Sequence, residues 1–291
     1  MKKIEFILLL CILFVQCDYR EIPVNKKYLG YTAQDCRAFQ GTPAWDLAKA
    51  VDDNDTSKII KILKQKPDLI DYRDPVWGYT VLMQSIKNKH YEAFMTLLRL
   101  GADVQIHNMK YGSSAIHLAV ETEDIRYVME VLHCGARIND YGNGCIKIDD
   151  RIGWTETPLI IAVRDACHGE KDMTMVKYLV EHGANPNINL GYDRNALLEA
   201  LSLGNFDVAI YLIEAGANYT IPMYRLKEDT VDSTVWEPIT IQQFVDECKG
   251  IIPTIYYRPD DISDSQYNRL TELISQPYVP KPTIYYHYDE E

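Results

Sequence analysis

The chain has 291 residues, a length that suits one large domain or two small ones. Its hydrophobic content of 47% and charged content of 25% are those of an ordinary globular protein with a sizeable core. The formal net charge of -12 repels phosphate backbones, which argues against nucleic acid as a partner and favours a basic or neutral one.

The first predicted element is an export signal. Two lysines precede an unbroken, largely apolar run over residues 6–15, which is shorter than the roughly 20 residues that a membrane-spanning helix needs. Cys17 follows shortly after this run. The pattern resembles a bacterial lipoprotein signal, in which the cysteine becomes the first residue and carries lipid. We predict a signal peptide over 1–16 and lipidation at Cys17; a cleaved signal without lipid and an uncleaved anchor are the alternatives.

Residues 17–43 are polar, mixed and aperiodic, which predicts a lipidated cysteine followed by a flexible tether. As a random coil, this tether reaches about 28 Å. The resemblance implies a lipoprotein on the periplasmic or cell-surface face of a bacterial membrane, with the lipid as its only membrane contact. Inner and outer membrane both stay open.

From residue 45 to residue 219 the sequence repeats. An apolar segment ends in Gly-Ala four times, with glycine spacings of 34, 48 and 33 residues. A left-handed glycine at this point satisfies the last carbonyls of a helix. A second marker ("TVLMQS", "SAIHLA", "TPLIIA", "NALLEA") starts another helix with a side chain that caps its N-terminus. The glycines are Gly101, Gly135, Gly183 and Gly216, and the capping residues are Thr80, Ser114, Thr157 and Asn195.

These markers resemble the ankyrin signature T-P-L-H-x-A with its period near 33 residues. The resemblance implies an all-α solenoid of five to six stacked helix pairs joined by short β-hairpin loops, over residues 44–220. Residues 221–291 are expected to form a degenerate capping repeat, with helices near 239–248 and 264–275, and a Tyr-rich tail. The function that the family implies is a monomeric protein–protein interaction module, here an envelope-tethered scaffold or inhibitor, with immunity against a toxin as a narrower version.

Two features depart from the family pattern. The fourth unit is lengthened by "DYGNGCIKIDDRIG" before its first helix and by "CHGEKD" between its helices, either as part of a binding face or as a solvated decoration. The segment PTIYY occurs at 253–257 and again at 282–286. Its alternating β-formers favour short strands, which either cover the last repeat or dock to a partner.

Catalytic and metal-binding motifs are missing from the sequence. There is no P-loop, HExxH or GxSxG motif and no Cys/His spacing that suits zinc. His117 stands at the signature histidine, which in the family hydrogen-bonds backbone near the hairpin. We therefore predict no enzyme, no catalytic residue, no metal and no cofactor. The rival hypotheses are an enzyme with its site in the C-terminal region and a purely structural envelope protein.

The cysteines that remain after the signal and Cys17 are odd in number and show no pairing pattern, so we predict no essential disulfide. They are Cys36, Cys134, Cys145, Cys167 and Cys248.

One position at the predicted hairpin tips stands out. Three residues before each capping residue, four repeats carry a large aromatic side chain where the family consensus is small or polar. Stacking would space these rings by about 10 Å, the usual distance between packed helices. Aromatic residues dominate interface hot spots, so we predict a partner-binding column; a structural ladder of packed rings is the alternative. The four residues are Trp77, Tyr111, Trp154 and Tyr192.

Overall fold

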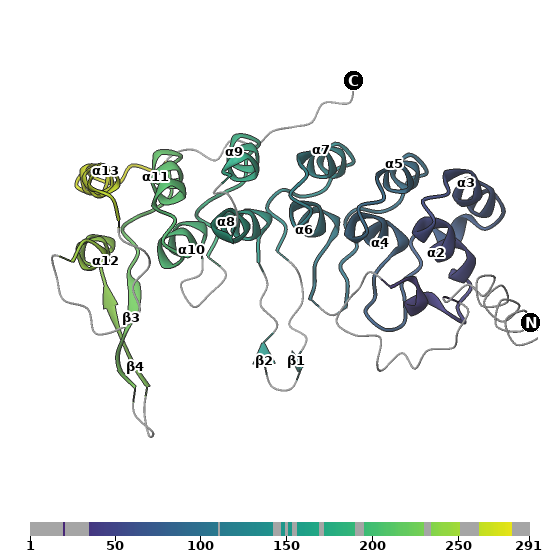
Figure 1. Cartoon of the computed structure of the whole chain (residues 1–291), viewed down its shortest axis with the longest axis horizontal. Coiled ribbons are helices and arrows are strands. Elements are labelled where there is room, and N and C mark those ends of the chain that lie inside the picture. Colours follow the sequence, from purple (N-terminus) through teal and green to yellow (C-terminus); the bar gives the residue numbers. More distant parts are fainter. Residues whose placement is uncertain are drawn as a thin grey trace, which may run out of the picture. The chain divides into compact units, whose positions relative to one another are not determined.

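The computed structural model describes residues 20, 35–109, 111–141, 147–148, 151–152, 156–168, 172–189, 195–229, 234–250 and 262–280 (Figure 1). The chain divides into two compact units, Met1–Lys110 and Tyr111–Glu291. Within this described part of the chain, no helix has both the length and the apolar character needed to cross a membrane.

The described residues of the first unit form two helix pairs. They are α2 (Trp45–Asp52) with α3 (Thr56–Gln65) and α4 (Val81–Lys87) with α5 (Tyr91–Arg99); the short 3-10 helices η3 (Cys36–Phe39) and η4 (Pro67–Leu69) accompany the first pair. Helix α4 packs on α2 and α5 packs on α3, so like helices lie side by side. Apolar residues spaced along each helix fill the space between them, because a single pair cannot bury its own apolar face. Fully buried examples are Leu47, Val51, Ile59, Phe94 and Leu97.

The flexible tether predicted for residues 17–43 is corrected for residues 35–43, which are folded against the first repeat. Cys36 and Phe39 are buried in η3, which packs on α2. Asp35 caps η3 by accepting a hydrogen bond from the Arg37 amide at 2.9 Å. The sequence-based prediction failed here because a four-residue helix is too short to show a hydrophobic period.

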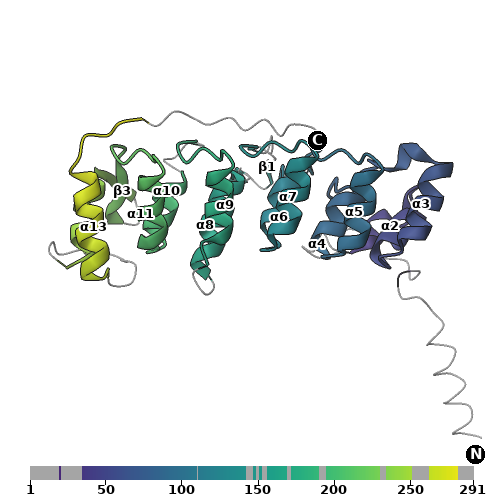
Figure 2. The ribbon, with the colours of Figure 1, turned by 90° about the horizontal axis from the view of Figure 1, so that it is seen from above.

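The second unit continues the pattern of helix pairs. Its elements are α6 (Ala115–Val120), α7 (Ile125–His133), α8 (Pro158–His168), α9 (Thr174–Glu181), α10 (Ala196–Ser202), α11 (Phe206–Glu214), α12 (Ile241–Cys248) and α13 (Asp264–Ile274). In Figure 1 the first helices of the pairs, α6, α8, α10 and α12, form one layer, and their partners form the other. Figure 2 shows the helices of this unit lined up pair after pair. The two C-terminal helices lie where the capping repeat was expected.

The predicted helix boundaries depend on caps that the structure contains. Asn195 accepts a hydrogen bond from the Leu198 amide at 2.9 Å, and Thr157 accepts one from the Ile160 amide at 3.2 Å. Ser114 forms a capping box with His117. The glycines that end the second helices have φ angles of +85 to +105°, the left-handed region predicted for them.

Asparagine side chains connect successive repeats of the second unit. The Asn139 amide donates to the Gly183 carbonyl at 3.0 Å, and its oxygen accepts from the Asn185 amide at 2.7 Å. Asn187 makes the same pair of bonds to the repeat that follows, with the Gly216 carbonyl and the Asn218 amide. Each side chain therefore satisfies backbone groups just beyond the end of a helix, where no intrahelical partner exists.

Two antiparallel strand pairs occur among the residues that the structure describes. Strands β1 (Lys147–Ile148) and β2 (Arg151–Ile152) form a small hairpin inside the predicted insert. Strands β3 (Met223–Asp229) and β4 (Thr234–Ile239) form a longer hairpin before α12, with Met223 opposite Ile239. The sequence did not predict this second hairpin. The strands predicted in the two PTIYY segments, at 253–257 and 282–286, lie outside the described residues.

Candidate partner-binding surface

Trp77 lies in a tight turn that a buried carboxylate organises. Asp74 Oδ1 accepts hydrogen bonds from the amides of Val76 and Trp77 at 2.8 and 2.7 Å, and its Oδ2 accepts one from the Tyr79 amide at 2.6 Å. Hydrogen bonds to an ionised acceptor are stronger than neutral ones. The turn therefore holds the backbone of the half-buried Trp77 in one conformation before any partner arrives.

The next loop of the same unit lies directly against this turn. The Met109 amide donates to the Trp77 carbonyl at 2.9 Å. Gly78 has φ +70°, and a Cβ at this position would lie 2.6 Å from Met109 Cγ, so only glycine fits. The Met109 side chain is 45% exposed. This part of the first unit therefore presents an apolar side chain beside the backbone of Trp77.

Tyr111 begins the second unit, and its side chain is 44% exposed. Three residues later, the Ser114 hydroxyl donates to Asp140 Oδ2 at 2.6 Å, which fastens this loop to the following one. The residue after Asp140 is Tyr141, which is 58% exposed. The bond between Ser114 and Asp140 therefore holds the backbones of two loops together, each with an exposed tyrosine nearby.

Tyr141 was missed by the sequence-based prediction. The prediction counted three residues back from each capping residue, and the insert before α8 moves Tyr141 far from that position. Its neighbour Asp140 is buried and holds the loop, but the sequence alone does not show that this aspartate is buried.

The four-residue aromatic column stays a prediction. Trp154 and Tyr192 lie outside the described residues, as does the predicted lipidation site Cys17. Trp77 and Tyr111 belong to different units, each of which is described by itself.

Ser114, His117 and Asp140 have the composition of a catalytic triad but a different arrangement. All three are buried, and the Ser114 hydroxyl donates to Asp140 Oδ2 while its oxygen lies 3.0 Å from His117 Nδ1, which is itself 4.0 Å from that carboxylate. The Ser114 amide donates to His117 Nδ1 at 3.1 Å, which makes this nitrogen an acceptor, and Nε2 lies 3.0 Å from the Glu156 carbonyl as a donor. A nucleophile needs a base that takes its proton, whereas this hydroxyl donates to a carboxylate. The cluster therefore lacks the order of a catalytic triad, and His117 hydrogen-bonds backbone groups, as the family resemblance implies.

A hollow of about 660 Å³ lies between the α6–α7 and α8–α9 turns of the second unit. Four carboxylates line it, together with apolar side chains. Three of them already have partners inside the chain: Asp124 pairs with Arg126, Asp165 with Arg164, and Asp172 accepts from Thr174. The hollow by itself therefore defines no ligand, and no metal-binding cluster of three or more side chains occurs among the described residues. Glu123 is the fourth of the carboxylates that line the hollow.

These features define a class of protein, a repeat of packed helix pairs whose connecting loops display exposed aromatic side chains. Residues 47–142 and 141–223 match the family described as "Ankyrin repeats (3 copies)", which together is more than half of the chain. The chain therefore belongs to the ankyrin-repeat family, and the expected all-α fold is confirmed. Ankyrin repeats are generally protein–protein interaction modules and typically non-enzymatic.

Several curated proteins are similar to the repeat region. Neurogenic locus notch homolog protein 1 of Danio rerio is 30% identical over 141 residues, which are 48% of this chain and 5% of that protein. The Mus musculus protein of the same name is 29% identical over 153 residues, 53% of this chain and 5% of that protein. The Homo sapiens protein is 29% identical over 141 residues. The chain spans about 5% of the length of these relatives, so the likeness concerns the repeats alone.

Proposed function

We propose that this protein binds a protein partner through its loop surface, as a monomer held by a lipid on Cys17 at the periplasmic or cell-surface face of a bacterial membrane. There it scaffolds or inhibits its partner, in the manner of an immunity protein. The binding residues that we propose are the predicted column of Trp77, Tyr111, Trp154 and Tyr192, together with the exposed Tyr141.

The observation that carries this proposal is the exposure of large side chains on loops that are themselves fixed. Tyr111 and Tyr141 are 44% and 58% exposed, while the bond between Ser114 and Asp140 joins their loops. A rigid aromatic side chain loses little conformational entropy on binding, so more of its contact energy appears as affinity. The structural ladder that competes with this proposal requires its rings to be packed, and the 44% exposure of Tyr111 speaks against full packing at that position.

The binding surface is tested by substitution once a pull-down from detergent extracts has supplied a partner. Tyr111→Ala is expected to weaken binding by about 2 kcal/mol, roughly thirtyfold, if Tyr111 is a hot spot. Met129→Ala is the matched control, because Met129 is 49% exposed but lies on helix α7. Equal affinities of the wild-type and Tyr111→Ala proteins would contradict the proposal.

The anchor is tested separately. Labelled palmitate is expected to enter the wild-type protein and not Cys17→Ser, and the variant is expected to leave the membrane fraction. Equal incorporation into both proteins would exclude Cys17 as the lipidated residue.

A further inference from the structure

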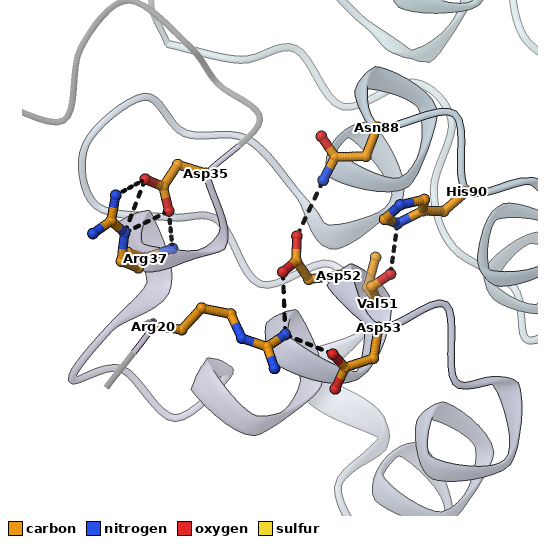
Figure 3. A network of polar contacts seen from close by, with 8 residues as sticks. All are labelled: Arg20, Asp35, Arg37, Val51, Asp52, Asp53, Asn88 and His90. Carbon is orange, nitrogen blue, oxygen red and sulfur yellow. Dashed lines mark hydrogen bonds and ion pairs between the residues drawn. The ribbon is translucent and has the colours of Figure 1, made fainter. Parts of the chain in front are cut away.

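Arg20 ties the chain just after the predicted lipidation site to the first repeat. Its Nη1 donates to Asp52 Oδ2 at 3.1 Å and to Asp53 Oδ1 at 2.7 Å (Figure 3). Its carbonyl accepts from Gln40 Nε2 at 3.1 Å. The Arg20 side chain is only 15% exposed. Asp52 is itself held by Asn88 Nδ2 at 3.3 Å. These contacts fix the chain at the turn that leads from α2 directly into α3.

Helix α3 carries a row of lysines on its outer side. Lys58, Lys61 and Lys64 are exposed, and their spacing of three residues places them within an arc of about 120°. Ile59 and Leu63 are buried on the opposite side, where the helix faces its neighbours. We call the three lysines the lysine face.

The lysine face is unusual for this chain, which has 42 acidic and 30 basic side chains. Helix α3 contains no acidic residue. None of the three ammonium groups forms an ion pair with a carboxylate among the described residues. Ile60 and Ile62, on the same helix, are half-buried, so apolar surface borders the charges.

We propose that the lysine face binds anionic phospholipid headgroups of the membrane that anchors the protein. The proposal rests on the proposed function, which places a lipid on Cys17, and it replaces the expectation that this lipid is the only contact with the membrane. Three residues from Cys17 to Arg20 span at most about 11 Å. A lipid at Cys17 therefore keeps Arg20 close to the headgroups, and the Arg20 side chain in turn holds the α2–α3 turn on the membrane side of the chain. A helix with lysines beside apolar surface suits the membrane interface.

Charge also favours an anionic membrane over a nucleic acid as the partner of the lysine face. The net charge of -12 repels a bulk polyanion that would surround the protein, such as a nucleic acid, whereas a flat membrane meets only the face turned toward it. The lipid on Cys17 holds the protein at the membrane, and the basic surface adds electrostatic attraction to anionic lipids.

The test measures how strongly the protein prefers anionic vesicles. We define this anionic preference as the partition coefficient on vesicles that contain phosphatidylglycerol, divided by the partition coefficient on phosphatidylcholine vesicles. The full chain carrying Cys17→Ser is used, so that no lipid contributes, and the ratio cancels apolar contributions from other segments. Each lysine near an anionic surface contributes about fivefold, so Lys58→Gln/Lys61→Gln/Lys64→Gln is expected to lower the preference about 100-fold. Raising the salt to about 1 M is expected to remove most of the difference.

The matched control removes three positive charges elsewhere. Arg73→Gln/Arg99→Gln/Lys177→Gln changes exposed residues outside α3 and is expected to leave most of the anionic preference in place. Equal preferences of the two triple variants would overturn the proposal, as would binding to duplex DNA or to an acidic protein with the same dependence on the lysines. Thermal melting of both variants verifies that they fold.

Failure of this proposal is distinguishable from failure of the anchor. Palmitate incorporation at Cys17 without a lysine-dependent preference would leave the anchor and refute the lysine face. A lysine-dependent preference without palmitate incorporation would support the lysine face and refute the lipid anchor at Cys17.

Discussion

Asn54 provides a cap for a helix of the neighbouring repeat, and its replacement tests how the repeats are joined. The N-cap residue of α5, His90, makes no capping hydrogen bond with its own side chain. Instead, Asn54 Oδ1 accepts from the Ala93 amide in the first turn of α5 at 2.8 Å, and Asn54 Nδ2 donates to Glu92 Oε2 at 2.7 Å. Asn54 also has φ +54°, a left-handed conformation that glycine adopts at the equivalent Gly204, with φ +72°.

Two substitutions separate the cap from the backbone conformation. Asn54→Gly loses the cap but keeps the left-handed turn without strain, and a lost cap costs about 1 kcal/mol. Asn54→Ala loses the cap and forces alanine into the left-handed region, which adds a further cost of about 1–2 kcal/mol. We therefore expect about 1 kcal/mol of destabilisation for the glycine variant and about 2–3 kcal/mol for the alanine variant.

The assay is urea unfolding followed by tryptophan fluorescence, since Trp45 and Trp77 both lie in the first unit. With a slope of about 2 kcal/mol per molar urea, the alanine variant is expected to shift the midpoint by about 1 M and the glycine variant by about 0.5 M. Wild-type midpoints for both variants would refute the idea that this side chain stabilises the contact between repeats. Identical shifts for both would refute the contribution of the left-handed backbone.

Three further predictions concern single side chains. Tyr111→Ala should change the free energy of unfolding by no more than about 0.5 kcal/mol, because the ring is largely outside the core; a loss above about 1 kcal/mol in thermal or urea unfolding would favour the structural ladder. A thiol reagent should modify the exposed Cys134 in the native protein but Cys36 only on unfolding, since burial and the Asp52 carboxylate raise the pKa of Cys36; equal rates would contradict its burial. Burial opposes the charge of Asp35, but hydrogen bonds from the neighbouring arginine outweigh burial and hold the pKa of this carboxyl below 3.8. The ionised Asp35 therefore stabilises the fold above pH 3.8, and this stabilisation is lost as the pH falls through the lowered pKa. Asp35→Asn should lower the free energy of unfolding at pH 7 and reduce the loss of stability on acidification. Urea unfolding at pH 7 and below pH 3.8 measures both effects.

The helix pairs could be predicted because the signals that define them are local. Asn195 caps its own helix, and Gly216 ends the helix of its own repeat, so both are recognisable from a few neighbouring residues. Contacts between repeats could not be predicted in this way. Asn54 and Asn139 act on residues 39 to 46 positions further along the chain, and nothing near them in the sequence identifies the partner.

The sequence proposes one part of the candidate site and not another for the same reason. The position of Tyr111 repeats with the helix pairs, so counting from the capping residue finds it. Tyr141 does not repeat, because it lies at the start of the insert, and its place depends on the long-range bond between Ser114 and Asp140. The β3–β4 hairpin was missed because the sequence pattern of the repeats fades after residue 219, and most of each strand shows no regular alternation.

The central claim is that the loop surface, and not the helix surface, recognises a protein partner. The most direct measurement places a photo-crosslinking amino acid at Tyr111, at Tyr141 or at Met129 of the full-length protein in living cells. All three side chains are large, apolar and 44 to 58% exposed, but the two tyrosines lie on loops and Met129 lies on α7. We predict that the same partner is crosslinked from both loop positions and not from Met129. Equal crosslinking from Met129, or none from either tyrosine, would contradict the claim.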